Sequence, residues 1–262
     1  MLTRRQFAQG GALAAVAGLL HAPAQATGNL ELAKIVLGAP PGGSGDLMAR
    51  RIVDKLRQLK YAKSVIVENR PGAAGQLAVT AVRDAAADGS ALLLVPSSQL
   101  SIYPYTYPKL PYRPEKDLKP VALMAYVNHG LAVGPAVPAG VRTLEQFLAW
   151  AKDHPTQATY GSPASGSMSH LIGASVAQQS ATPMTHIPYK GSIPAVQDLR
   201  GAQISAVTAP IGSFLPYLKE GRIRLLAVSG EKRSPFAGDV PTYLELGYPL
   251  IAREWYGFFA PE

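Results

Sequence analysis

The segment Leu37-Gly38-Ala39-Pro40-Pro41-Gly42-Gly43-Ser44-Gly45-Asp46 says more about the fold than any other part of this sequence. The apolar run Ile35-Val36-Leu37 leads into it and predicts a buried strand. After it, apolar residues recur at helical spacing from Met48 to Leu59. A strand, a glycine-rich turn and a helix start gather free backbone N–H groups, and the helix N-terminus adds roughly half a positive charge. The segment therefore predicts a site for a carboxylate or phosphate, with a simple tight turn as the alternative.

The better-known glycine-loop motifs do not fit this segment. A P-loop needs a lysine after its last glycine, whereas Asp46 and Leu47 follow here. A dinucleotide fingerprint that starts at Gly43 and Gly45 meets Met48 where its third glycine belongs. Nucleotide binding is therefore not expected. Asp46 falls in the first helical turn, where a carboxylate favours the helix dipole, so we expect it to cap the helix.

Residues 1–26 are predicted to be a targeting segment. Thr3-Arg4-Arg5-Gln6-Phe7 precedes an uncharged run from Gly10 to Leu20, and Ala24-Gln25-Ala26 has the small-residue pattern of a cleavage site. The uncharged run is too short and too rich in glycine and alanine for a membrane anchor. The paired arginines resemble a twin-arginine export signal, with the ordinary secretory route as the alternative. On either route, the protein leaves the cytoplasm.

Composition narrows the function classes further. The chain of 262 residues has no cysteine, which excludes disulfides and a thiol nucleophile, and it is long enough to bury a substantial core. Its net charge is +8, to which Arg4 and Arg5 of the targeting segment contribute two. Because no dense run of lysine and arginine is interleaved with aromatic residues, nucleic acid is not an expected partner.

Apolar strand segments alternate with helical segments along the rest of the chain. Strands that are apolar throughout and are separated by helices are typical of a parallel sheet covered on both faces, so the fold class is α/β. Dense proline from Tyr103 to Pro120 predicts an ordered surface loop, whose tyrosines are expected to pack rather than to edge a ligand cleft. The expected strands after the first are 65–68, 91–95, 121–126, 131–133, 159–161, 204–207 and 223–228.

Small, polar loops recur between the strands and the helices. Besides Pro40–Asp46, they are Gly161–Ser169 and Tyr189–Ser192, and Ser97-Ser98-Gln99 is a plainer loop after another strand. In open α/β sheets, ligands bind beyond the carboxyl ends of the strands, which is where each of these loops is expected. The side-chain hydroxyls and free backbone N–H groups of these loops together predict a polar cleft.

An enzyme is the competing class. The histidines after the targeting segment have none of the spacings of a metal site, and we expect no metal and no cofactor. His170 with Ser165 or Ser167 could imitate a hydrolase pair. No G-x-S-x-G elbow is present, however, and no acid is evidently placed to orient the histidine, so an exported hydrolase is a remote alternative.

Taken together, the motifs of the chain resemble a known family, the Bug-type periplasmic solute-binding proteins of tripartite tricarboxylate transporters. The matches keep the family order from about Lys34 to Pro261, and together they are far more specific than any one of them. They are Pro40-Pro41-Gly42-Gly43 with Asp46 and Ala49-Arg50, Val67-Glu68-Asn69-Arg70-Pro71-Gly72 with Gly75, Asp88-Gly89, Leu110-Pro111-Tyr112, Gly161-Ser162 with Gly166-Ser167 and His170-Leu171, Pro188-Tyr189-Lys190-Gly191 with Pro194, Lys232-Arg233-Ser234-Pro235, and Asp239-Val240-Pro241-Thr242.

The resemblance implies two α/β lobes of the type II periplasmic-binding-protein fold. Strands near 121–126 and 223–228 would cross between the lobes. Lobe one would then comprise residues 27–123 and a return at 223–262, and lobe two residues 124–222. Relatives continue beyond the position of Glu262 through helices that complete lobe one, so we expect this chain to be truncated and an apolar face of lobe one to be exposed.

The resemblance also implies a function. A small organic carboxylate would be held mainly by backbone amides and delivered to the membrane subunits of the transporter by a periplasmic monomer. An accessory receptor that docks on a membrane sensor is the alternative. Relatives often carry an acidic or amide pair where this chain has Thr208-Ala209-Pro210, which argues against an amino-acid ligand. The ligand-binding residues carried over are Pro41, Gly42, Gly43, Ser44, Ser97, Ser98, Ser162, Ser165, Gly166, Ser167, Tyr189, Lys190 and Gly191.

Overall fold

The computed structural model of the protein describes residues 30–262. The predicted targeting segment, with its paired arginines and its cleavage site near Ala26, lies outside the described residues. Within the described part of the chain, no helix combines the length and the hydropathy needed to cross a bilayer.

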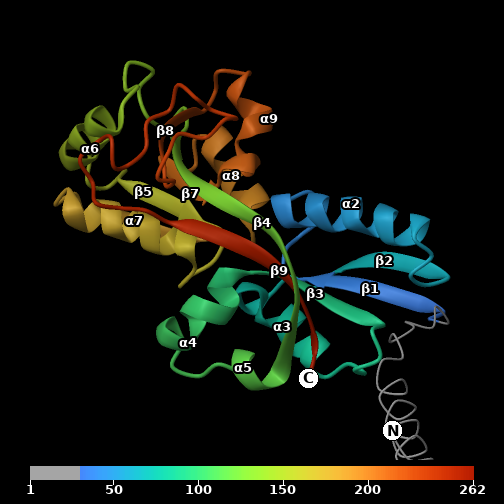
Figure 1. Ribbon diagram of the computed structural model, residues 1–262. Helices are drawn as coiled ribbons and strands as arrows, with labels where there is room; N and C mark the ends of the chain where they lie inside the picture. Colours follow the sequence, from blue (N-terminus) through green and yellow to red (C-terminus); the bar gives the residue numbers. More distant parts are fainter. Residues whose placement is uncertain (1–29) are drawn as a thin grey trace, which may run out of the picture.

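The first lobe is built around three parallel strands. In its sheet, β1 (Leu32–Leu37) lies between β2 (Ser64–Asn69) and β3 (Ala91–Pro96) and pairs in parallel with both. The helices α2 (Ser44–Gln58) and α3 (Gln76–Arg83) cover opposite faces of this sheet (Figure 1). The predicted strands in this part of the chain and the covering of both faces are confirmed.

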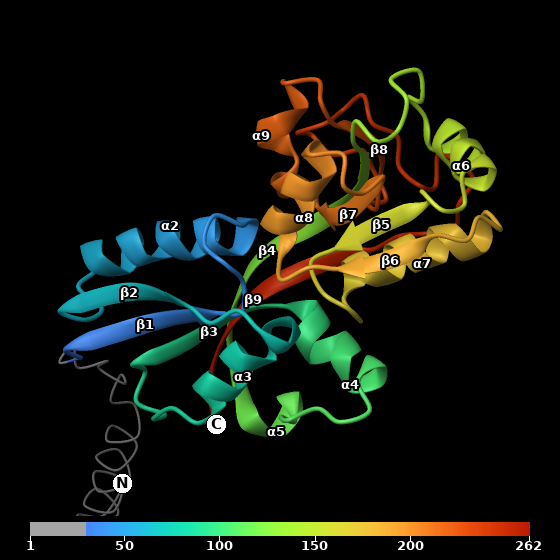
Figure 2. The ribbon, with the colours of Figure 1, turned by 180° about the vertical axis from the view of Figure 1, so that it is seen from behind.

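The second lobe repeats the same plan. Its strand β5 (Thr159–Ser162) lies between β6 (Thr185–Pro188) and β7 (Ala206–Pro210), again in parallel with both. The helices α7 (Met168–Gln179) and α8 (Ser192–Arg200) follow β5 and β6, and Figure 2 shows them packed beside these strands. Both lobes therefore present the carboxyl ends of their parallel strands, and the helix starts that follow, toward one another.

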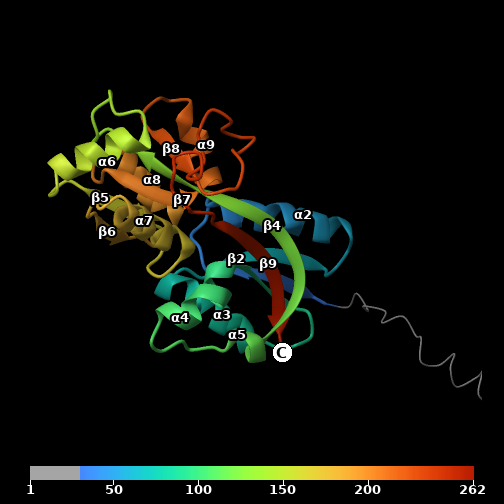
Figure 3. The same ribbon diagram turned by 60° about the vertical axis from the view of Figure 1, so that its left-hand side comes forward.

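One long strand, β4 (Leu118–Val133), joins the lobes. From Leu118 to Asn128 it pairs antiparallel with β9 (Arg253–Pro261) in the first sheet, and from His129 it pairs with β7 in the second. Figure 3 shows β4 and β9 running side by side between the lobes. The sequence predicted this crossing near 121–126, but it treated 131–133 as a separate strand, whereas the backbone stays extended throughout.

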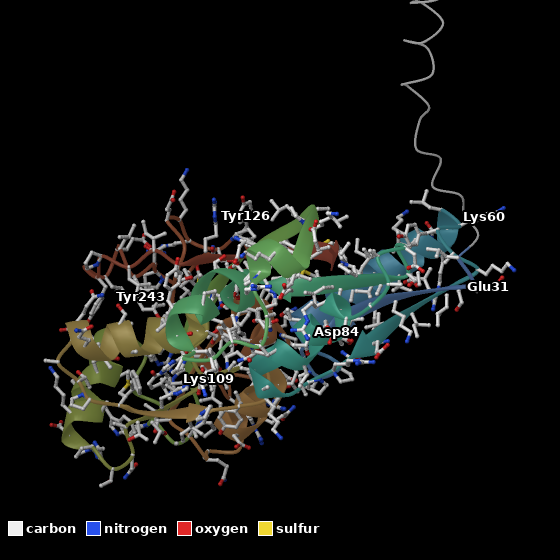
Figure 4. All side chains as sticks on the ribbon, turned by 90° about the horizontal axis from the view of Figure 1, so that it is seen from below. Glu31, Lys60, Asp84, Lys109, Tyr126 and Tyr243 are labelled. Carbon is white, nitrogen blue, oxygen red and sulfur yellow. The ribbon has the colours of Figure 1, made fainter. Side chains whose placement is uncertain are left out.

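The second predicted crossing is wrong. The strand β8 (Arg224–Val228) pairs with the end of β4 inside the second lobe, and the chain returns to the first sheet at β9. Between these strands, Tyr243 and Leu250 are buried in the core of the second lobe; Tyr243 is labelled in Figure 4. Apolar periodicity identifies 223–228 as a strand, but it carries no information about which sheet that strand joins.

The proline-rich stretch 103–120 is not a plain loop. It forms α4 (Tyr103–Thr106) and α5 (Pro114–Asp117), and its last residues already belong to β4. Both helices have proline in the first turn, where the missing N–H has no helical partner to lose. The remaining short elements are η1 (Ala73–Gly75), η2 (Ser98–Ile102), η3 (Ile211–Ser213) and α9 (Leu215–Leu218).

Each lobe has its own hydrophobic core. In the first, Val53 of α2 packs with Ile35 of β1 and Leu94 of β3. In the second, Phe147 packs with Leu131 of β4 and is fully buried. The C-terminal part of β4 thus contributes to the core of the second lobe, and its N-terminal part belongs to the sheet of the first lobe.

The outer face of β4 is apolar and exposed. Val121, Leu123 and Tyr126 are 55%, 56% and 56% exposed, and Figure 4 shows Tyr126 at the surface. The guanidinium of Arg253, on the neighbouring β9, lies 4.3 Å from the centre of the Tyr126 ring. A cation over an aromatic face is a favourable contact, but it covers only part of this surface.

The helix α6 (Leu144–Asp153) begins with a capping box, which the spacing of Thr143-Leu144-Glu145-Gln146 in the sequence predicts. The Thr143 hydroxyl accepts a hydrogen bond from the Gln146 N–H at 3.2 Å, and the Gln146 side chain accepts one from the Thr143 N–H at 3.2 Å. The two residues satisfy each other's backbone donors, which otherwise lack helical partners.

We expect Thr143→Ala to lower the free energy of unfolding by about 1 kcal/mol, because it removes the acceptor for a helix-start N–H. Urea denaturation of the purified protein measures this. Thr156→Ala, at an exposed turn position, is the control and should stay within about 0.5 kcal/mol of wild type. Equal effects of the two substitutions would contradict the stabilising role of the box.

Candidate ligand-binding site

A cavity of about 600 Å³ lies between the lobes. Lobe one contributes the end of β1, the start of α2, residues 71–76 and the start of η2. Lobe two contributes Pro163, Ala164, Ser165, Ser167 and Ser169 around the start of α7, and residues 188–193, which lead into α8. The loops that follow separate parallel strands therefore share one hollow, as the sequence predicted for the carboxyl ends of the strands. A cavity of this size is typical of a small-molecule site.

The predicted ligand-binding residues divide into two groups. The cavity is lined by Gly43, Ser44, Ser98, Ser165, Ser167, Tyr189, Lys190 and Gly191. The residues Pro41, Gly42, Ser97, Ser162 and Gly166 are not part of its lining. Among the latter, Pro41 and Gly42 are exposed on the outside of the first loop, while Ser97 and Ser162 are buried. A role in ligand binding remains a prediction for every member of the set.

Asp46 holds the first loop in shape. It is buried, and its carboxylate accepts hydrogen bonds from the Gly42 N–H at 2.9 Å and from the Asn69 side chain at 3.0 Å. Arg50 pairs with it at 2.8 Å. Burial alone would raise the pKa of Asp46, but the bonds from Arg50, Gly42 and Asn69 outweigh it and hold the pKa below its usual value. Asp46 thus bonds back to the loop from the first turn of α2. It is not the N-cap residue as the sequence predicted, because Gly43 occupies that position.

Two helix starts from different lobes open onto the cavity. Among the described residues, no acceptor contacts the backbone N–H groups of Ser44 and Gly45 in α2, or those of Ser192 and Ile193 in α8. All four of these residues line the cavity. Unpaired N–H groups at helix starts are good donors to an anion, and the two helix dipoles add positive potential.

The loops that lead into these helices meet directly. Gly191 has a φ of 103°, and a Cβ atom built on it would lie 2.7 Å from Cδ of Pro40 in the opposite lobe. Only glycine fits this position, because a side chain would both strain the backbone and collide with the other loop. The two helix starts are therefore brought together when the lobes are closed.

Further contacts hold the lobes together around the cavity. The Tyr107 hydroxyl donates to the carbonyl of Ser165 at 2.9 Å, and the Met168 N–H donates to the Ser98 hydroxyl at 3.0 Å. Tyr103, one helical turn before Tyr107, also lines the cavity and donates to the Ala74 carbonyl at 3.0 Å. The sequence predicted only packing for the tyrosines of this stretch. The spacing of Tyr103 and Tyr107 by four residues was the signal that both side chains could lie on one face of a helical turn.

An acidic group in the cavity was missed altogether. Glu254 of β9 is 4% exposed and lines the cavity, where it accepts hydrogen bonds from the N–H of Ser98, at 3.2 Å, and from the Ser98 hydroxyl. Nε2 of the fully buried His129 lies 3.3 Å from its other oxygen. Burial would raise the pKa of Glu254, but His129 and Ser98 hold it below its usual value. Among the residues that line the cavity, Glu254 and Lys190 are the charged ones.

A second polar cluster lies behind the loop 163–169. The rings of His170 and His186 stack with their centres 3.9 Å apart, and Nδ1 of His170 accepts a hydrogen bond from the Gly166 N–H at 3.0 Å. Nδ1 therefore carries no proton. Burial lowers the pKa of His170, and burial together with the neighbouring His170 lowers the pKa of His186 to about 4. Both rings are neutral at neutral pH.

This cluster does not form a hydrolase pair. The Ser162 hydroxyl lies 2.8 Å from Nε2 of His186 and 3.1 Å from the Ala164 carbonyl, but Ser162 is fully buried and is not part of the cavity lining. Ser167 donates to the Ala164 carbonyl, at 2.7 Å, and accepts from the His170 N–H. The Ser167 hydroxyl thus gives its hydrogen to a backbone carbonyl and not to a histidine, whereas a serine nucleophile needs a base for its proton. Among the described residues, no group of three potential metal ligands is found either.

Comparison with known proteins identifies the family of this chain. The family model described as "Tripartite tricarboxylate transporter family receptor" matches residues 48–262. The chain belongs to this family. Its receptors are periplasmic solute-binding proteins and not enzymes, so the hydrolase hypothesis is rejected.

Individual relatives agree with this assignment. The receptor is 36% identical to the "UPF0065 protein in gbd 5'region" of Cupriavidus necator, over all of this chain and 80% of that protein. It is 34% identical to BugT of Bordetella pertussis, over 87% of this chain and 70% of BugT. A shorter match, 38% identical, to a UPF0065 protein of Bordetella bronchiseptica covers 81% of this chain and 62% of that relative.

Solved structures share the fold. The structure described as "R. palustris Rpa4515 with adipate" superposes with a TM-score of 0.83 at 29% identity, over 88% of this receptor and 77% of that chain. MatC from Rhodopseudomonas palustris with bound malate gives a TM-score of 0.80 at 30% identity, over 88% and 78%. The two-lobe α/β fold of a periplasmic binding protein is thereby established for the receptor.

The histidine stack predicts a pH dependence of stability. A histidine in the unfolded chain titrates near 6.5, whereas His186 in the folded receptor titrates at about 4. Between these pH values the unfolded chain binds a proton that the folded protein does not, so stability falls as the pH drops from 6.5 toward 4. Thermal unfolding at a series of pH values should show this fall, and His186→Asn should make it shallower.

The control for this experiment is His154→Asn, which removes an exposed histidine at the end of α6. It should leave the slope of melting temperature against pH as in wild type. A His186→Asn receptor that lost stability as steeply as wild type between pH 6.5 and 4 would show that the stack does not cause the dependence.

Proposed function

We propose that this receptor captures a small organic carboxylate outside the cytoplasm and delivers it to the membrane subunits of a tripartite tricarboxylate-type transporter. Residues 1–26 would direct its export to the periplasm, by the twin-arginine route, and would be cleaved near Ala26. It would work as a monomer and need no cofactor. Membership of the receptor family supports the transport role, and the geometry of the cavity supports the carboxylate.

The observation that carries the proposal is the pairing of α2 and α8 across the cavity. Each lobe supplies unpaired backbone donors at a helix start, and the donors share one cavity that is enclosed by both lobes. A hydrogen bond from an amide to a carboxylate contributes roughly 1.5–3 kcal/mol, so a few of them account for micromolar binding. Because the donors come from both lobes, the anion itself would hold the cleft closed.

The structural neighbours are consistent with this chemistry. One is described with adipate and another with bound malate, and both compounds are carboxylates. At identities of 29% and 30%, these neighbours share the fold of this receptor, and neither fixes its ligand. Carboxylate binding is therefore proposed as a class.

A thermal-shift screen tests the proposal. We expect monocarboxylates, dicarboxylates or tricarboxylates to raise the melting temperature, because a ligand that binds only the folded state stabilises it by mass action. Sugars and nucleotides serve as controls and should leave the melting temperature unchanged. A response to those controls and to no acid would overturn the carboxylate assignment.

Gly191 offers a sharper test of the closed cleft. We expect Gly191→Ala to weaken binding of any acid found in the screen by at least about tenfold, because the added methyl strains the backbone and meets Pro40. Titration calorimetry measures the change. Gly140→Ala is the matched control, since nothing lies within 4 Å of a Cβ built there and its φ is not in the left-handed region. Equal affinities of the two variants would contradict closure through this contact.

Lys190 is a further candidate contact. It lines the cavity but is exposed, so its attraction to a carboxylate is screened by solvent. We expect Lys190→Ala to weaken carboxylate binding by roughly two- to fivefold, and less at high salt. Lys152→Ala, on the exposed side of α6, is the control. Unchanged affinity in the Lys190 variant would remove this residue from the site.

A further inference from the structure

We infer that Glu254 makes this receptor selective for carboxylates that carry a hydrogen-bond donor, an ammonium or a hydroxyl group, at the end away from the anchored carboxylate. The same residue would select against dicarboxylates. The inference rests on the proposed function, since it assumes that α2 and α8 hold one carboxylate, and it specifies the other end of the ligand.

The carboxylate of Glu254 is fixed in place. Ser98 contributes two hydrogen bonds to one oxygen, and His129 lies 3.3 Å from the other. The Ser98 hydroxyl is itself held by the Met168 N–H of the opposite lobe. The group thus has no freedom to swing away from a repelling ligand. The oxygen near His129 has one contact and retains the capacity to accept another hydrogen bond.

The carboxylate of Glu254, and not the imidazole of His129, faces the cavity. Glu254 lines the cavity, whereas His129 lies behind it and is fully buried outside the lining. The polar groups around Glu254 within the cavity are the hydroxyl of Ser98 and the phenols of Tyr103 and Tyr256. Burial is the main cause that raises the pKa of both tyrosines; the nearby Tyr107 adds to it at Tyr103, and the charge of Glu254 adds to it at Tyr256. Both phenols therefore stay neutral.

Tyr256 connects Glu254 to the start of α2 along the cavity wall. Tyr256 lies two residues beyond Glu254 on the same face of β9, which places the two about 7 Å apart along the strand. The ring of Tyr256 reaches the start of α2, because a Cβ built on Gly45 would lie 3.3 Å from it. Glu254 and the start of α2 therefore lie on either side of Tyr256 in the lining of one cavity.

Electrostatics then decides between ligands. The cavity walls contain many apolar and small residues, and its other charged residue, Lys190, is exposed. A second ligand carboxylate beside Glu254 would face a like charge in a poorly screened place, whereas an ammonium would gain a charge-assisted hydrogen bond. The segment Thr208-Ala209-Pro210 lacks the acidic or amide pair that relatives often carry there. In this receptor, Glu254 of β9 supplies an acidic group to the cavity instead.

Four six-carbon acids that differ only at the far end provide the test: hexanoate, 6-hydroxyhexanoate, 6-aminohexanoate and adipate. Titration calorimetry at neutral pH should rank the two donor-bearing acids tightest and adipate weakest, with 6-aminohexanoate at least about tenfold tighter than adipate. This ranking is measured on the wild-type receptor alone. If adipate bound the wild-type receptor as tightly as 6-aminohexanoate or more so, the inference would be wrong.

Glu254→Gln removes the charge and keeps the shape. It should reduce the preference for 6-aminohexanoate over adipate by roughly tenfold, while Glu145→Gln, an exposed residue of α6, should leave the preference unchanged. Circular dichroism checks that each variant is folded; if Glu254→Gln is not, the wild-type ranking decides. An unchanged preference in a folded Glu254→Gln receptor would overturn the inference. Failure of all four acids, and of every acid in the thermal-shift screen, would instead overturn the proposed function.

Discussion

The antiparallel pairing of β4 with β9 is the constraint on which the rest of this structure depends. These two strands are hydrogen-bonded from Leu118 opposite Pro261 to Asn128 opposite Arg253, and they carry the chain out of the first lobe and back again. His129 and Glu254 lie at the far end of this ribbon, where the lobes meet. The same hydrogen bonds that join the lobes therefore also position the acidic group of the cavity.

Most of the cavity is shaped by backbone and by small side chains. Glycine is required where the loops touch, at Gly191 against Pro40, and also at Gly38, where a Cβ would lie 2.5 Å from the Cα of Gly75. In the proposed function, main-chain donors would recognise a carboxylate and not the rest of the ligand. Selectivity must then come from the few side chains that enter the cavity.

The sequence predicted those parts of the structure that depend on local patterns. The strand at 35–37, the small loops and the capping box at Thr143 follow from periodicity and from helix-start chemistry, and the structure has them. Long-range pairing was out of reach. The strand at 223–228 was expected to cross between the lobes, and nothing in its own residues indicates which strand it pairs with. Neither β9 nor the role of Glu254 was predicted, because the neighbours Ser98 and His129 lie far away in the sequence.

The position of β9 in the chain has a consequence for folding kinetics. The second lobe is built from the end of β4 and the residues between β4 and β9, so it can assemble from contacts closer in sequence than the pairing of β4 with β9. The sheet of the first lobe is different, because β3 and β4 must wait for a strand that leaves the ribosome only after the whole second lobe has been made. Pairing at such sequence separation is slow, since a long loop must close first. The first lobe is thus expected to fold last, although most of it is synthesised first.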